Sequence, residues 1–133
     1  MIKILVDSSF YIASLLPEDS NHESVKKIVQ NLNKERSEIT TEDFLKEALT
    51  IISQRLGRKT AIDFYERLLE TTYIAQITSE HFQKGLSIFL DPALNKNISL
   101  IDCIASIVYN EIGVDVILTF DRHFQKLDLK VIP

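Results

Sequence analysis

Short β-rich runs alternate along this chain with longer segments whose apolar residues recur every three or four positions. The run Ile2–Val6 stops at Asp7–Ser9, three residues that favour the position just before a helix. A second compact run, Val114–Thr119, follows a helical segment that opens at Ser99 and ends at Gly113. Strands that alternate with helices in this way predict an α/β fold of three layers (α/β/α), in which helices flank a short central parallel sheet.

The rest of the chain continues this pattern without repeats, linkers or low-complexity tracts. With 133 residues and 45% apolar content, the chain can bury one core, so residues 1–133 are expected to form a single domain. Pro92 and the polar residues 95–97 predict a loop. Further helices are expected over residues 21–33, 41–57, 59–70 and 79–90, and short strands over 72–78 and 129–132, the last at an edge.

Three features bear on location and chemistry. No run approaches the roughly 18 to 20 uncharged apolar residues that a membrane span needs. The N-terminus begins in a strand-like pattern and lacks the layout of a signal peptide. Cys103 is the one cysteine, which excludes an internal disulfide and a cysteine-based zinc site. We therefore expect a soluble, cytoplasmic protein with no membrane partner.

Four acidic residues occupy positions from which one crevice can be reached. Ligands of open parallel sheets bind at the carboxyl ends of the strands. Asp7 ends the first strand and Asp121 follows the last compact one, so their carboxylates converge if these strands are neighbours. Asp102 lies in the first turn of a helix and can project toward the same rim. Glu47 falls at the border of the apolar stripe of its helix.

Carboxylates packed together repel one another and raise one another's pKa values unless a divalent cation compensates. Such hard oxygen ligands suit Mg²⁺ or Mn²⁺ better than zinc. A cation held in this way could promote hydrolysis of a phosphodiester. The sequence thus favours a metal-dependent hydrolase over covalent catalysis, for which no nucleophile arrangement is present.

Each acid also has a purely structural interpretation. Asp7 can cap the helix that follows it, and Asp102 can form a capping box with Ser99. Asp121 can be a turn residue, and Glu47 a solvated helix charge. For each acid taken alone, the structural interpretation competes with a role in a metal site. The prediction of a site rests on the four acids taken together.

The order and local context of these acids resemble the PIN-domain family across essentially the whole chain. The matching segments are Ile4–Ser9, Thr41–Leu49, Ile98–Asp102 and Leu118–Phe124. No single segment is specific, but the four occur together in this order. The resemblance implies a metal-dependent nuclease, with Ser8 or Thr119 as supporting polar groups. It implies that four acids are both the catalytic residues and the ligands of Mg²⁺ (or Mn²⁺), namely Asp7, Glu47, Asp102 and Asp121.

PIN domains of this single-domain size are similar to VapC toxins, which cut structured RNA, form homodimers and are silenced by an antitoxin that blocks the site. The resemblance therefore implies an endoribonuclease that is the toxin of a type II toxin–antitoxin pair. The expected partners are an RNA substrate, a cognate antitoxin and a second copy of the chain. One departure concerns the last motif, where Arg122 and His123 follow Asp121 in place of a second acid. The number of metal ions and the role of His123 stay open.

Two alternatives share the same fold. A PIN-like module could bind RNA or protein without cutting, although the presence of all four acids favours an enzyme. A housekeeping RNA-processing nuclease would share the chemistry and differ in regulation. The net charge of −4 is unfavourable for an RNA-binding protein, whose affinity comes largely from Lys and Arg on phosphates. If the four acids bind metal, however, the remainder of the chain is neutral.

A different enzyme class is disfavoured by one residue. A haloacid-dehalogenase-like phosphatase would need a second aspartate where Ser9 stands.

Overall fold

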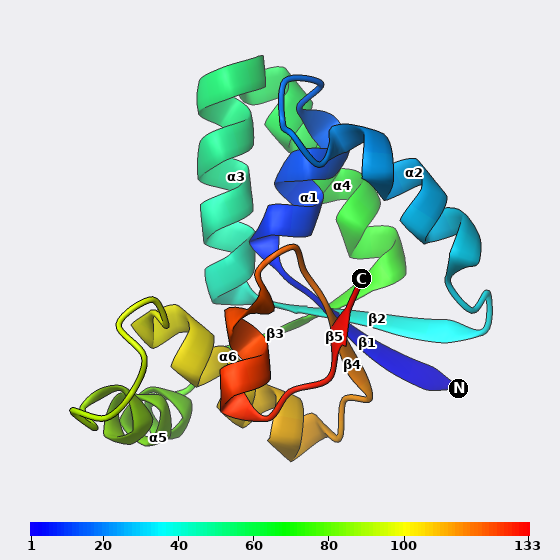
Figure 1. The fold of residues 1–133 in the computed structure, drawn as a ribbon. Helices are drawn as coiled ribbons and strands as arrows, with labels where there is room; N and C mark the ends of the chain where they lie inside the picture. The colour runs from blue at the N-terminus through cyan, green and yellow to red at the C-terminus, as the bar shows by residue number, and fades with distance from the viewer.

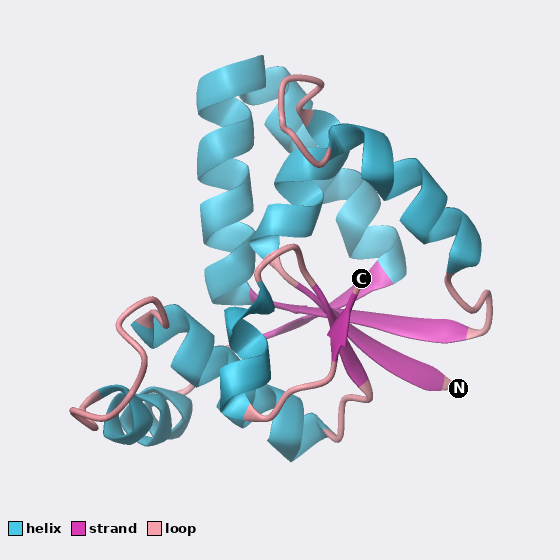
Figure 2. Ribbon diagram, in the orientation of Figure 1, coloured by secondary structure: helices cyan, strands magenta, loops and turns pink.

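In the computed structural model, which describes residues 1–133, five strands form an all-parallel sheet in the order β3-β2-β1-β4-β5 (Figure 1). Helices α1 to α4 cover one face of the sheet, α6 and the 3-10 helix η1 cover the other, and α5 packs against α6 (Figure 2). The predicted three-layer α/β/α fold is therefore confirmed. In chain order the elements are β1 (Ile2–Val6), α1 (Ser8–Leu15), α2 (His22–Asn31), β2 (Arg36–Thr41), α3 (Glu42–Leu56), α4 (Arg58–Thr71), β3 (Thr72–Ala75), α5 (Ser79–Phe89), α6 (Leu100–Ile112), β4 (Val116–Leu118), η1 (Arg122–Leu127) and β5 (Val131–Ile132).

The strand β1 lies in the middle of the sheet and is buried on both faces. Ile4, Leu5 and Val6 are each 1% exposed or less. Because successive side chains of a strand point to opposite faces, Ile4 and Val6 join the core beneath α1–α4, whereas Leu5 joins the core beneath α6. Burial on both faces explains why this run is continuously apolar rather than alternating.

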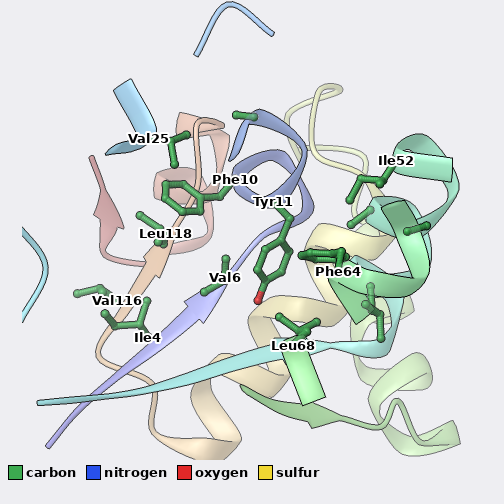
Figure 3. Close-up of a cluster of buried hydrophobic side chains, with 14 residues drawn as sticks. Ile4, Val6, Phe10, Tyr11, Val25, Ile52, Phe64, Leu68, Val116 and Leu118 are labelled. Atoms are coloured by element: carbon green, nitrogen blue, oxygen red, sulfur yellow. The ribbon is translucent and has the colours of Figure 1, made fainter. Parts of the chain in front are cut away.

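In the first core cluster, α1 packs together with the other helices of its layer, α2, α3 and α4 (Figure 3). The rings of Tyr11 on α1 and Phe64 on α4 meet edge to face, with centroids 5.3 Å apart. Phe10 and Val25 bring α1 and α2 into the same cluster. This packing fixes the start of α1 directly beyond the end of β1.

The second core cluster joins α3 to η1 across the edge of the sheet. Phe44, in the first turn of α3, and Phe124, in η1, are each 1% exposed, and their rings meet edge to face at 6.3 Å. Both belong to the cluster that also contains Ile117 of β4. The beginning of α3 and the segment after β4 are therefore held together at the carboxyl ends of the strands.

The sequence pattern does not predict β2 or η1. The strand β2 contains one aliphatic residue, Ile39, and its first three residues are half-buried and polar. Its buried threonines satisfy their own hydroxyl groups. Thr40 donates to the carbonyl oxygen of Val6 at 2.8 Å, and Thr41 caps α3. A strand that buries hydroxyl groups in this way lacks the aliphatic signature on which strand prediction depends.

The other predicted elements are present, with small shifts of their ends. The strands expected over 72–78 and 114–119 are shorter, at Thr72–Ala75 and Val116–Leu118. Gly113 ends α6 in the left-handed conformation, at φ 76°. The expected edge strand is β5, which pairs with β4 alone.

The strands β1 and β4 are neighbours, as the convergence of Asp7 and Asp121 requires. In their parallel register Val6 lies opposite Leu118. The backbone N–H of Asp7 then donates to the carbonyl oxygen of Leu118 at 3.1 Å. The residues that follow the two strands therefore emerge side by side at one edge of the sheet.

The contact of α5 with α6 predicts a strong effect of Gly85→Ala. A Cβ atom at Gly85 would lie 2.9 Å from both the backbone N and the Cα of Ile104. Because backbone atoms cannot move aside without shifting α6, we expect a loss of about 1–3 kcal/mol in the free energy of unfolding. Urea denaturation measures this change. Ser87→Ala, at an exposed position of the same helix, should stay within about 0.5 kcal/mol of the parent protein. An equal loss in both variants would contradict the close packing.

Candidate functional site

The Asp7 carboxylate is buried at the carboxyl end of β1 and is 6% exposed. Asp7 occupies the N-cap position of α1, but its side chain does not cap the helix. Instead Oδ2 accepts hydrogen bonds from Thr119 Oγ1 at 2.6 Å and from Ser9 Oγ at 2.7 Å, and Oδ1 accepts one from Ser8 Oγ at 3.2 Å. The capping interpretation of this residue is therefore wrong, and three hydroxyl groups hold the carboxylate in one orientation.

Thr119 and Ser9 also tie the end of β4 to the start of α1. The backbone N–H of Asp121 donates to Thr119 Oγ1 at 2.9 Å, and that of Phe120 donates to Ser9 Oγ at 3.2 Å. The two hydroxyl oxygens are 3.2 Å apart. The segment that carries Asp121 is therefore positioned by the same groups that orient Asp7.

Asp121 follows this segment and caps η1. Its Oδ1 atom accepts a hydrogen bond from the backbone N–H of His123 at 2.8 Å and lies 2.7 Å from His123 Nδ1. The interpretation of Asp121 as a turn residue therefore accounts for Oδ1, which makes both of these contacts. Oδ2 accepts no hydrogen bond from the protein and remains available at the same edge of the sheet.

Asp102 reaches this edge because α6 runs antiparallel to β4, which places the beginning of α6 at the carboxyl ends of the strands. The predicted capping box is present, since Asp102 N donates to Ser99 Oγ at 3.0 Å and Asp102 Oδ2 accepts from Ser99 N at 3.1 Å. Burial raises the pKa of Asp102. The hydrogen bonds with Ser99 oppose this rise, and the nearby charges of Asp7 and Asp121 add to it. Asp102 is therefore both a helix cap and a member of an acidic group.

Glu47 lies on α3 and belongs to the same group. Although the residue as a whole is exposed, partial loss of hydration at its carboxyl group and the charges of Asp7, Asp102 and Asp43 raise its pKa from 4.5 to about 7. Repulsion of this kind requires the carboxyl groups to be close, so the acid that follows β1 and the acids of α3 and α6 share one electrostatic environment.

Two residues at this edge were missed by the sequence reasoning. Ser9 binds the same oxygen of Asp7 as Thr119, and the signal was a hydroxyl residue two positions after an acid at a strand end. Asp43 stands one helical turn before Glu47, and i, i+4 spacing puts two like charges on one side of α3. The latter signal was available from the sequence alone.

The acids fit a divalent cation in their chemistry and location, but they are not assembled into a ligand cage. No three of the chain's His, Cys, Asp and Glu side chains lie close enough together to hold a metal ion as they stand. Asp102 and Asp121 each use one oxygen in local hydrogen bonds and keep the other. Side-chain rotation, above all of the long and exposed Glu47, would be needed to bring the donors together. Carboxylate oxygens are the ligands that Mg²⁺ and Mn²⁺ prefer.

A profile of the PIN domain family matches residues 4–130, which is nearly the whole chain. The chain belongs to the PIN domain family. The profile spans all four acids predicted from the sequence, and the resemblance to this family is confirmed. No curated protein matches the chain by sequence. None of the helices of this PIN domain combines the length and the apolarity that crossing a bilayer requires.

Solved structures of toxins and toxin–antitoxin complexes share the fold of this PIN domain. VapC20 from Mycobacterium tuberculosis, described as a sarcin-ricin loop cleaving toxin, superposes with a TM-score of 0.82 at 20% identity over 95% of each chain. FitAcB from Neisseria gonorrhoeae gives a TM-score of 0.72 at 19% identity, covering 98% of this chain and 96% of the other. VapBC2 from Rickettsia felis, bound to a promoter DNA fragment, gives 0.68 at 10% identity over 98% of both chains. At these identities the likeness establishes the fold.

The raised pKa of Glu47 predicts that the metal-free protein loses stability as the pH rises. Between about 4.5 and 7 the folded state binds this proton more strongly than the unfolded state, so the stability that Glu47 contributes decreases across that interval. Glu47→Gln should therefore melt at a higher temperature than the parent above pH 7. The two proteins should melt together near pH 4.5.

Thermal denaturation in the presence of a chelator measures this difference. Glu66→Gln, at an exposed position of α4, serves as the control and should melt like the parent at every pH. A difference between Glu47→Gln and the parent that does not change with pH would contradict the electrostatic origin of the effect.

Proposed function

We propose that this PIN domain is a Mg²⁺- or Mn²⁺-dependent endoribonuclease and the toxin of a type II toxin–antitoxin pair. The observation that carries the proposal is the gathering of acidic side chains from four elements at the carboxyl edge of the sheet. Burial and the neighbouring carboxylates raise the pKa values of Glu47 and Asp102, as happens where the mutual repulsion of acids lacks a compensating cation. A divalent cation would relieve that repulsion, and we propose that it binds to Asp7, Glu47, Asp102 and Asp121.

The four acids have different roles in such a site. Asp7 is the fixed group, because three hydroxyl hydrogen bonds prevent it from rotating. Asp102 and Asp121 are each held at one oxygen by a cap, and the other oxygen accepts no hydrogen bond from the protein. Glu47 is the exposed member, on α3, and its longer side chain has room to rotate toward the other acids. When bound, the cation supplies stabilisation of the charge that develops on the phosphodiester and activation of the attacking water.

The comparisons support the choice of substrate and partner. One structure of similar fold is described as a toxin that cleaves the sarcin-ricin loop, and others are complexes of a toxin with its antitoxin. We therefore propose structured RNA as the substrate and a cognate antitoxin as the protein partner. A homodimer and a cytoplasmic location form part of the same proposal.

Binding of the cation should stabilise the folded protein. Mg²⁺ or Mn²⁺ at about one hundred times its dissociation constant would add about 2.7 kcal/mol to the free energy of unfolding. We expect a metal-dependent rise in melting temperature that EDTA reverses and that Asp7→Asn abolishes. Asp63→Asn, at an exposed position of α4, should keep the full rise. An equal rise in the Asp7 variant would place the cation elsewhere.

Cleavage should depend on the same residues. With Mg²⁺ or Mn²⁺, the purified protein should cut an RNA stem-loop. Asp7→Asn and Glu47→Gln should each slow the cut by a factor on the order of 100, the scale typical of groups that act in the transition state. Gel electrophoresis of labelled structured and single-stranded RNA measures the rates, again with Asp63→Asn as the control.

Induced expression of the parent chain, but not of Asp7→Asn, should arrest bacterial growth if the nuclease is a toxin. Undiminished cutting by Asp7→Asn would refute the assigned site. Absence of cutting on every RNA, despite metal binding, would favour the non-cleaving PIN-like module.

A further inference from the structure

A cavity of about 440 Å³ lies between α2 and the segment that follows β4. It falls within the range of about 300–1,000 Å³ that is usual for small-molecule sites, so one nucleotide fits it in size. Most of the residues that line it are polar. The residues that matter here are Asn21, Lys27, Asn31, Thr119, Phe120 and Arg122.

The cavity adjoins the acidic edge of the sheet, which is the carboxyl edge that carries Asp7, Glu47, Asp102 and Asp121. Thr119 lines it and donates the 2.6 Å hydrogen bond to Asp7. Phe120 lines it as well, and its ring stacks on Phe10 with centroids 5.7 Å apart and planes inclined by 16°. If a strand of nucleic acid lies with one phosphate at the acids, its neighbouring nucleotide therefore reaches this cavity.

The charge of the cavity is opposite to that of the acidic edge. Lys27 and Arg122 are exposed, and neither has a carboxylate within 4.0 Å. Several other basic residues are paired with acids, including Arg55 with Glu18 at 2.8 Å. Unpaired cations beside side-chain amides suit a nucleotide, because the cations attract its phosphate and the amides can hydrogen-bond to its base.

We propose that this cavity binds the RNA nucleotide next to the scissile phosphate, with Lys27 and Arg122 contacting its phosphate group. The inference rests on the proposed nuclease function and extends it to substrate binding. Lys27 and Asn31 are four residues apart, which puts them on the same side of α2. The neighbouring Lys26 does not line the cavity, and neither does Lys126 of η1.

The test measures RNA binding apart from cleavage. Fluorescence anisotropy with a labelled single-stranded RNA oligonucleotide in EDTA gives the affinity at several salt concentrations. The double variant Lys27→Ala, Arg122→Ala should bind about tenfold more weakly at low salt. Its slope of log affinity against log salt should fall by about 0.7 for each lost phosphate contact.

The matched control is the double variant Lys26→Ala, Lys126→Ala, which removes the same charge from the same two elements. It should keep the affinity within about twofold and leave the slope close to that of the parent. The exchange Lys27→Arg, Arg122→Lys preserves charge and should keep the slope, while unchanged melting temperatures exclude misfolding. An equal loss in the control, or an unchanged slope in the Lys27 and Arg122 variant, would overturn the proposal.

A second readout locates the RNA. In the NMR spectrum of the parent protein, the side-chain amide signals of Asn21 and Asn31 should shift when the oligonucleotide is added. The signal of Asn33, which lies beyond α2 and outside the cavity lining, should not. The opposite pattern would overturn the proposal. Failure of the nuclease function itself appears separately, as the absence of cutting of every RNA by the parent protein.

Discussion

The central strand β1 pairs with β2 on one side and β4 on the other, and the acidic edge depends on these pairings. The register of β1 with β4 sets Val6 opposite Leu118, so that Asp7 and Thr119 emerge together and hydrogen-bond. A shift of one residue would turn the side chains of one strand to the other face and separate the two groups. The full burial of β1 makes such a shift costly, because it would exchange the residues of the two cores.

The acids at this edge destabilise the folded protein, whereas the sheet and its two cores stabilise it. Asp7, Glu47 and Asp102 lose hydration and repel one another, and part of that cost appears as the raised pKa values of Glu47 and Asp102. Folding brings the acids to one edge despite this repulsion, because burial of the two hydrophobic cores, which include none of the acids, outweighs it. A site assembled at the expense of stability is usual where a ligand later supplies the missing interaction.

Much of this site could be predicted from the sequence, and the reasons differ from residue to residue. Asp7 and Asp121 follow apolar strand-like runs, and parallel pairing alone brings such positions to one edge. Asp102 was predicted from its place in the first turn of a helix that faces the same edge, although its capping box with Ser99 also allowed a purely structural role. The strand β2 was not predictable, because it buries the hydroxyl groups of Thr40 and Thr41 where aliphatic residues would be expected. The hydrogen bond of Ser9 to Asp7 depends on the precise start of α1, which local sequence does not specify.

The three hydroxyl groups around Asp7 make the two oxygens of its carboxylate unequal. Oδ2 accepts from Ser9 and Thr119, which occupies the two lone-pair positions of a carboxylate oxygen. Oδ1 accepts only from Ser8, in a longer contact, and retains one lone pair. The carboxylate can therefore bind a positively charged ligand through Oδ1 alone, and not through both oxygens. In this fold the hydroxyl side chains, rather than the acid itself, decide from which side Asp7 is approached.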